Sequence, residues 1–472
     1  MSGYFLLAVL FIVLIMLVII TYWLRTVQKN NEAEDETNAE KTIAEKYNVV
    51  TSQTFIYTAI LLTTIGIIVS IYLIVKGTIW EGHLMEWMNI VVRLMHITFG
   101  IAWIGASFYF VFLENALNRT KDIRDELAGN LWAIHGGGFY YLEKYKTAPK
   151  TIPKHLHWFK YEAYFTWLSG FCLLFVVYYF NAKSILIDKN ILNIGPLTGI
   201  GIGVASFIVA WVLYDLLCKT ALVKQSILFA IIGFIICVGF AWFYCRVFSA
   251  RAAYMHFGAM LGTLMAANVF FVIIPAQKAM VKAASLGLPL NPQLGKNALL
   301  RSVHNNYFTL PVLFVMISNH FPTTFGYEYP WVILAIITLG TAGVKHYLNQ
   351  KEKGQLSVWV LPASILILLA AAYISAPAKP GACNEEISYS QVNSIIQSRC
   401  ISCHSAAPTD DFYKAPPNGV AYDTPEKIVQ LKDKIMQRVV VTKTMPQNNK
   451  TNITEKERDI IRCWINQGAS LK

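Results

Sequence analysis

The chain has 472 residues, of which 55% are hydrophobic and only 14% are charged. This composition excludes an ordinary soluble protein, because about a quarter of the residues of a soluble domain are charged. The net charge of +12 does not indicate nucleic-acid binding. The basic residues gather in loops between long apolar segments, where their charge sets the orientation of a membrane protein.

Apolar runs of membrane-spanning length recur along most of the chain. Tyr307–Ser318 is short and contains Pro311, so we expect it to start earlier, near Leu299, or to form a broken helix. The first run lacks the basic start and the cleavage site of a signal peptide, so we expect it to be retained. About ten transmembrane helices are predicted: Tyr4–Leu24, Phe55–Val75, Trp87–Leu113, Tyr161–Phe180, Pro196–Leu217, Ser226–Val247, Ala252–Ile274, Tyr307–Ser318, Trp331–Leu348 and Val358–Ser375.

The loops between these runs differ in charge. Loops 25–53, 114–160, 218–225, 275–306 and 349–355 hold most of the basic residues, whereas Gly77–Glu86 and His320–Pro330 hold none. Cytoplasmic loops are the ones enriched in Lys and Arg. The pattern therefore predicts that both chain ends lie outside the cytoplasm.

These elements predict an all-α protein in four parts. Residues 1–86 form an N-terminal extension with two transmembrane helices and an acidic linker, and residues 87–375 form an eight-helix membrane domain surrounded by lipid. Residues 376–383 are a short hinge. Residues 384–472 form a small all-α domain with the helical pattern of a class I cytochrome c.

Two histidines fall within predicted membrane helices. Ionisable side chains are costly inside a bilayer and often mark function. His96 and His256 are therefore candidate ligands of a haem b that would supplement the haem c described below. The alternative is that both are hydrogen-bonded between helices and have only a structural role.

Two polar clusters are predicted on the inner side of the membrane domain. One contains His135, Gly136 and Gly137, whose backbone N–H groups could bind an anion. The other contains Arg301, His304 and Asn305. We expect a pocket in which His135 or His304 is the catalytic base and Gly136, Gly137, Arg301 and Asn305 bind substrate. A belt of aromatic and basic residues at the membrane surface is one alternative. If the protein binds only haem c, the site would instead lie on the outer face, near His83, Arg93, His256 and Asn319.

The most specific motif is Cys400-Ile-Ser-Cys403-His404. The pattern C-x-x-C-H attaches haem c: the two thiols form thioethers with the porphyrin, and the histidine binds the iron. A redox disulfide and half of a zinc site are the alternatives. No βαβ pattern and no second cysteine pair at zinc spacing accompany the motif.

Methionine is the usual second ligand of such an iron, and it raises the potential. Met445, which precedes Pro446 in a loop, is favoured over Met436, which lies in a helical pattern. The last helix, Thr454–Gly468, opens with a capping box and should pack across the first helix of the domain. Cys383 and Cys463 remain, either as a disulfide or as two free thiols.

Several long segments resemble the membrane-bound urate hydroxylases of bacteria, and the tail from Cys400 to Gln467 resembles the cytochrome c fused to them. The resemblance covers about four-fifths of the chain; residues 1–86 precede it. The segments are WLSG (Trp167–Gly170), NAKSILID (Asn181–Asp188), HFGAMLGT (His256–Thr263), AANVFFVIIP (Ala266–Pro275), RSVHNNYFTLPVLF (Arg301–Phe314) and HGGGFYYLEKYK (His135–Lys146).

The resemblance implies an oxidoreductase of the bacterial inner membrane that converts urate to 5-hydroxyisourate in purine breakdown. Electrons would pass to haem c on the extracytoplasmic face, then to a downstream cytochrome or terminal oxidase. Two other functions remain open. One is a quinol- or partner-linked electron-transfer subunit without an organic substrate, and the other is a purine permease that carries a cytochrome sensor.

Overall fold

The computed structural model describes residues 59–471 except 61–62, 65, 68–69, 72, 77, 150, 154–155, 356, 377–380, 411–412 and 414. The predicted helix Tyr4–Leu24 and the acidic linker lie outside the described residues, and Phe55–Val75 is described only in part. The chain divides into two compact units, Met1–Trp87 and Met88–Lys472. The second unit contains nearly all the elements discussed below.

Six helices in the described part of the chain are long and apolar enough to cross a membrane. This agrees with a helical membrane protein, whereas the count of ten remains a prediction. The six are α3 (Ile79–Ala116), α4 (Tyr161–Leu174) with η1 (Phe175–Tyr179), α5 (Pro196–Lys219), α6 (Ser226–Val247), α7 (Ala250–Ala267) with η4 (Asn268–Ile273) and α8 (Ile274–Ser285), and α11 (Pro330–Glu352).

The predicted run Tyr307–Ser318 is the second half of a longer helix, α9 (Pro292–Ser318). The side chain of Asn291 caps its first turn by accepting a hydrogen bond from Gln293 N at 3.0 Å. The helix continues past Pro311, so it is not broken there, and it begins seven residues before Leu299. Shorter elements are η2 (Ala182–Leu186), η3 (Ala221–Lys224), α10 (Pro322–Phe325) and the apolar α12 (Val360–Ile374).

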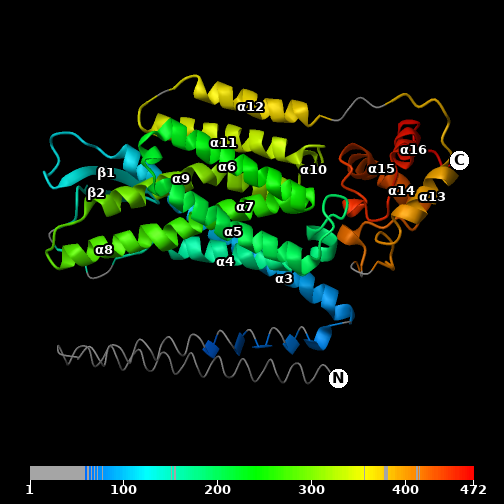
Figure 1. Cartoon of the computed structure of the whole chain (residues 1–472), viewed down its shortest axis with the longest axis horizontal. Helices are drawn as coiled ribbons and strands as arrows, with labels where there is room; N and C mark the ends of the chain where they lie inside the picture. Colours follow the sequence, from blue (N-terminus) through cyan, green and yellow to red (C-terminus); the bar gives the residue numbers. More distant parts are fainter. Residues whose placement is uncertain are drawn as a thin grey trace. The chain divides into compact units, whose positions relative to one another are not determined.

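Helix α7 is the central element of the membrane domain. It contacts α4, α5, α6 and α9 (Figure 1), and more than half of its residues are buried. Small residues let helices approach closely in membranes. At Gly258 an added Cβ would lie only 2.5 Å from Val315 Cγ1 on α9.

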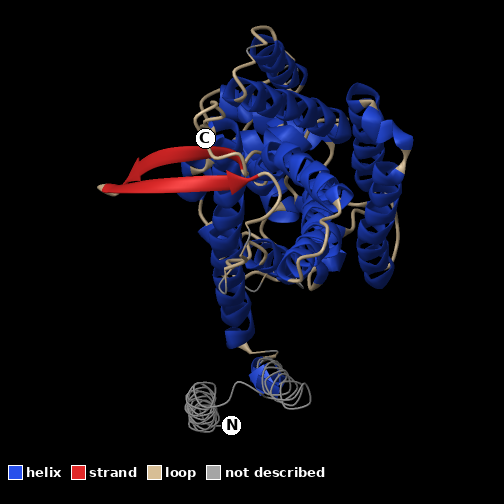
Figure 2. Ribbon diagram, turned by 90° about the vertical axis from the view of Figure 1, so that its left-hand side faces the viewer, coloured by secondary structure: helices blue, strands red, loops and turns tan. Residues whose placement is uncertain are grey.

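The all-α prediction is wrong for one segment, which forms a β-hairpin. Strands β1 (Leu127–His135) and β2 (Gly138–Tyr145) pair antiparallel and extend away from the helices in Figure 2. Gly136 and Gly137 form the two-residue turn, with φ of 58° and 81°. Two consecutive residues with positive φ favour a tight hairpin. The sequence analysis did not predict the two strands that these glycines join.

The C-terminal domain packs α13 (Tyr389–Arg399) against α16 (Glu455–Asn466), as expected. Its core includes Val392, Ile396 and Trp464. The helical pattern around Met436 is divided into α14 (Pro425–Gln430), α15 (Lys432–Ile435) and η6 (Met436–Val441). The short elements η5 (Pro417–Gly419) and η7 (Gln447–Asn449) lie in the loops. The predicted capping box is present at Thr454 and Glu457.

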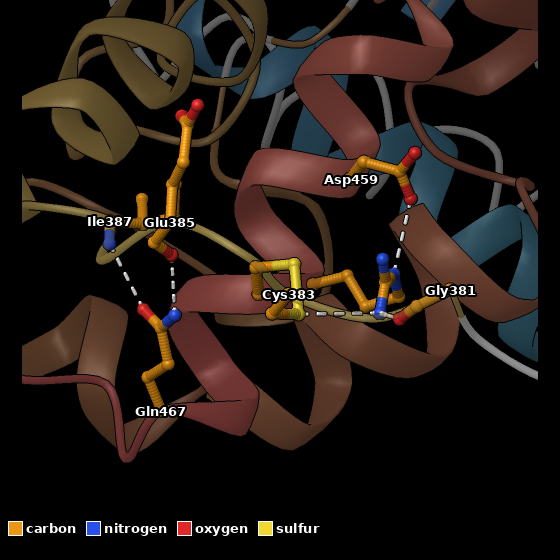
Figure 3. Close-up of a disulfide and its surroundings, with 8 residues drawn as sticks. Gly381, Cys383, Glu385, Ile387, Asp459 and Gln467 are labelled. Atoms are coloured by element: carbon orange, nitrogen blue, oxygen red, sulfur yellow. Dashed lines mark hydrogen bonds and ion pairs between the residues drawn. A yellow bond between two sulfur atoms is a disulfide. The ribbon is translucent and has the colours of Figure 1, made fainter.

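A disulfide joins Cys383 to Cys463 and fixes the start of this domain to α16 (Figure 3). Beside it, the Gln467 side chain donates to Glu385 O at 2.7 Å and accepts from Ile387 N at 3.0 Å. Of the two alternatives for these cysteines, the structure has the disulfide.

The contact between α7 and α9 predicts unequal effects for two glycines on one helix. Gly258→Ala should lower stability by about 1–3 kcal/mol, the usual cost of overpacking, because its Cβ would clash with Val315. Gly262→Ala is the matched control, because nothing lies within 4 Å of its added Cβ. Thermal unfolding of the two variants in detergent measures the difference. Equal midpoints would contradict the close contact.

Candidate functional site

A cavity of about 270 Å³ lies inside the membrane domain between α3, α4, α5, α7 and α9. Its lining is mainly apolar and aromatic and includes Trp103 and Trp167. Its few polar groups include Arg93, Asn319 and His320. Ligand pockets typically combine apolar walls with a small number of polar groups. This cavity is therefore a candidate site for a small molecule.

His96, one of the two predicted functional histidines, lines this cavity. Its Nδ1 lies 3.0 Å from Thr166 O and 3.3 Å from Ser169 Oγ. A carbonyl oxygen can only accept, so Nδ1 carries the proton and Nε2 keeps a free lone pair in the neutral ring. Position 170 must be glycine for this arrangement, since a Cβ there would lie 2.8 Å from His96 Cε1.

His256, the other predicted ligand of haem b, does not line the cavity. Its Nδ1 donates to Ala252 O at 2.8 Å, so the proton is on Nδ1, and its Nε2 lies 3.2 Å from the hydroxyl of Tyr179. The ring is fully buried and lies 4.4 Å from the ring of Phe248. Both ring nitrogens of His256 therefore have protein partners, whereas His96 keeps one nitrogen free. Their joint role as haem b ligands remains a prediction.

The inner cluster on α9 forms a closed hydrogen-bonded network. Arg301 donates to Asp215 Oδ1 at 2.6 Å and to Asn268 Oδ1 at 3.3 Å. Asn268 donates in turn to Asn305 Oδ1 at 2.8 Å, and Asn305 donates to Met265 O at 3.0 Å. The structure thus brings together the predicted substrate ligands Arg301 and Asn305, but their side chains already bind other protein groups.

The two predicted catalytic histidines are not brought together. His304 lies 2.8 Å from the Tyr214 hydroxyl through Nδ1 and stacks on Phe229. His135 is exposed at the end of β1, beside the turn formed by Gly136 and Gly137. Among the described residues, no hydrogen bond links this turn to His304.

A polar group on α11 was missed by the sequence reading. Lys345 is buried, and its Nζ lies 3.8 Å from the centre of the Phe108 ring. Nearby, Asn349 donates to Asn306 Oδ1 at 2.9 Å, and His346 bonds Tyr307 at 2.7 Å. The signal was present, because a lysine inside an apolar run is unusual, but the surrounding amides become neighbours only through the packing of α9 on α11.

The C-x-x-C-H motif directly follows α13. Cys400 and Cys403 are free thiols, and His404 places Nδ1 3.0 Å from Val420 O. The proton is therefore on Nδ1 and the lone pair of Nε2 is free, which is the usual state of a metal-binding histidine. These three residues fit covalent attachment of a haem.

The two alternatives for this motif receive no support from its surroundings. Burial raises the pKa of the Cys400 thiol to about 12, whereas the reactive cysteine of a redox C-x-x-C pair has a lowered pKa. In the described part of the chain, no three His, Cys, Asp or Glu residues cluster as metal ligands. A structural zinc needs four ligands, but a haem iron needs only two from the protein.

Met445 is better placed than Met436 for a shared site with Cys400. Met445 packs against the hydrophobic core to which Cys400 belongs. Its backbone is held on both sides: its N–H donates to Arg438 O at 3.0 Å, and its carbonyl accepts from Arg458 at 2.8 Å. Its role as iron ligand remains a prediction.

The loop that follows Met445 contacts the membrane domain. Gln447 donates to Ser184 O at 3.1 Å, and Asn448 donates to Ser184 O at 3.0 Å and to Ile187 O at 2.9 Å. Asn190 donates back to Asn448 O at 3.3 Å. The C-terminal domain is therefore fixed to the turn that contains η2.

Arg251 lies beside the polar part of the cavity. This residue, at the start of α7, donates to Asn319 Oδ1 at 2.9 Å, and Asn319 lines the cavity. Burial, and then the charge of Arg251, lower the pKa of Arg438 in the C-terminal domain. The charge of Arg251 therefore acts on the C-terminal domain from the edge of the cavity.

Comparison with known proteins gives one family. The sequence model of the family described as urate oxidase N-terminal matches residues 82–376, which is more than half of the chain. No curated protein and no solved structure matches the chain significantly.

The inner network predicts a contrast between two partners of one carboxylate. Asp215 pairs with Arg301, which is 5% exposed, and with Lys219, which is 68% exposed. Asp215→Asn should destabilise the protein by about 3–5 kcal/mol, because it leaves a buried cation uncompensated. Lys219→Met should cost at most about 1 kcal/mol, since it removes only a surface ion pair.

Thermal and denaturant unfolding of the two variants in detergent measure these losses. Equal stability of Asp215→Asn and Lys219→Met would mean that Arg301 does not depend on Asp215.

Proposed function

Because the chain belongs to the urate oxidase N-terminal family, we propose that its membrane domain oxidises urate and passes the electrons to a haem c on its C-terminal domain. The family supports a urate-related oxidoreductase, and the apolar helices support a membrane location. We place the protein in the bacterial inner membrane, with the C-terminal domain outside the cytoplasm.

The proposed reaction is a two-electron oxidation of urate, in which water supplies the oxygen atom and haem c accepts the electrons. Urate gains the oxygen of one water molecule to become 5-hydroxyisourate, and two electrons and two protons are released. A haem c bound to Cys400, Cys403 and His404, with Met445 as second ligand, would accept these electrons one at a time. A downstream cytochrome or terminal oxidase must therefore take up the first electron before the second is accepted.

The observation that carries the proposal is the position of the cavity. It lies within the segment matched by the family, and it borders Asn319, which is bonded to Arg251 beside the C-terminal domain. This position would favour transfer of electrons from a bound substrate to the C-terminal domain. Its aromatic walls would stack on a planar purine, and Arg93 would attract the urate anion.

Within this cavity, His96 is the proposed general base. The hydrogen bond from Nδ1 to Thr166 O leaves Nε2 free to take a proton from urate or from water. A neutral imidazole is suited to this role near neutral pH. His96 thus replaces His135 and His304 as the proposed base. Neither of those two side chains lines this cavity.

The distance to the haem also favours the cavity over the inner cluster. Electrons released at the inner face would have to cross roughly 30 Å of hydrocarbon. An intermediate haem b would be needed there, and both ring nitrogens of His256 already have protein partners. For the proposed site, the cavity wall and the surface that binds the C-terminal domain are close in the sequence. Tyr178 lines the cavity and lies only six positions before Ser184, which binds the C-terminal domain.

Anaerobic addition of urate to the oxidised full-length protein should reduce haem c and consume urate, as followed by the haem α-band and the urate absorbance. His96→Gln should slow this reduction by about a hundredfold or more, because a general base contributes that much. His157→Gln is the matched control, because His157 is 69% exposed and does not line the cavity.

The outcomes of this experiment distinguish between the proposed functions and test the role of His96 separately. Reduction of the wild-type protein by a quinol but not by urate would favour the electron-transfer subunit. Reduction of His96→Gln at the wild-type rate would contradict the role of His96 while leaving the urate reaction intact.

Replacement of the second iron ligand gives a spectroscopic test of the haem site. Met445→Ala should abolish the weak near-infrared band of the methionine–iron bond and lower the reduction potential, because a thioether ligand raises it. Met436→Ala is the matched control and should keep both properties. Retention of the band in Met445→Ala with its loss in Met436→Ala would transfer the role to Met436.

A further inference from the structure

The contact between the two domains involves a loop that follows the proposed iron ligand. Met445 is two residues before Gln447 and three before Asn448, and both amides bind the membrane domain. Asn448 has a left-handed backbone, with φ of 51°, which asparagine tolerates better than most residues. Its side chain is thereby able to bridge two carbonyls, those of Ser184 and Ile187.

The surface that receives this loop is a built part of the membrane domain. Ser249, the N-cap of α7, binds the carbonyls of Ile185 and Leu186. The adjacent carbonyls of Ser184 and Ile187 bind Asn448 instead. The end of η2 therefore takes its hydrogen-bond donors from two sources, one within the membrane domain and one from the C-terminal domain.

The receiving turn also connects to the cavity. Residues Ile185, Leu186 and Ile187 are buried in the same core cluster as Tyr178, and Tyr178 lines the cavity. The turn that binds Asn448 therefore belongs to the same packed core as a residue of the cavity wall. Electron transfer between proteins slows steeply with separation, so contact at this point would matter for its rate.

We propose that Gln447 and Asn448 form an electron-transfer dock, which holds the haem end of the C-terminal domain against the Ser184–Ile187 turn. This inference rests on the proposed function. In each passage one electron leaves the urate-derived species in the cavity, and ferric haem c becomes ferrous. Gln447 and Asn448 are positioning residues in this process, because they touch neither urate nor the iron.

The test uses a double variant of the full-length holoprotein that carries Gln447→Ala and Asn448→Gly. Glycine keeps the left-handed backbone and removes only the amide. After anaerobic mixing with urate, the rate of haem c reduction should fall about tenfold, because a set of hydrogen bonds that holds the dock is lost. Urate consumption with a small diffusible one-electron acceptor should not change.

Two further measurements separate docking from damage to the haem site. Haem content and the methionine–iron band should match the wild type. Hydrogen exchange of residues 182–187 should increase in the double variant. Gln397→Ala is the matched control, because that amide is exposed and bonds only within its own helix, to Asn393.

A variant in the membrane domain tests the same contact without changing the C-terminal domain. Asn190→Ala leaves that domain's sequence intact and removes the bond to Asn448 O. Haem reduction should therefore also be slower than in the wild type. Unchanged reduction rates in both variants would overturn the dock, whether or not exchange at 182–187 increases. If urate is not consumed by the wild type with any acceptor, the proposed function itself fails.

Discussion

The close approach of α7 to α9 at Gly258 and Val315 organises the membrane domain. Because Gly258 has no side chain, α7 packs directly against Val315 of α9, and both residues line the cavity. The two predicted functional histidines differ in their surroundings. His96 lines the cavity, whereas His256, on α7, is buried beside Phe248.

The same interior shows two ways to place polar groups in apolar surroundings. In the inner network, the polar side chains are hydrogen-bonded to one another: Arg301 donates to Asn268, and Asn268 donates to Asn305. The network therefore stabilises the packing of α5, η4 and α9. In the cavity, by contrast, His96 uses only one ring nitrogen. A polar atom without a protein partner is available to a ligand, which is why we assign the chemistry to the cavity.

Sequence reasoning was most reliable where chemistry depends on local spacing. It gave the apolar helices, the capping box at Thr454 and the C-x-x-C-H motif, because each is defined within one turn or one run. It missed the hairpin, since two aromatic strands beside glycines resemble an apolar belt. The grouping of His135 with His304 rested only on a shared side of the membrane. The outer-face alternative named two residues of the cavity, Arg93 and Asn319. The full lining could not be predicted, because it comes from five helices far apart in the sequence.

The disulfide between Cys383 and Cys463 closes a covalent ring in the C-terminal domain. The two cysteines are 80 positions apart, and the ring encloses Cys400, Cys403, His404 and Met445. A protease that cuts once within the ring would therefore release no fragment: the nicked pieces would stay joined, with all four residues still attached to the membrane domain. Only reduction of this bond, or a cut in the hinge before Cys383, would set part of the domain free.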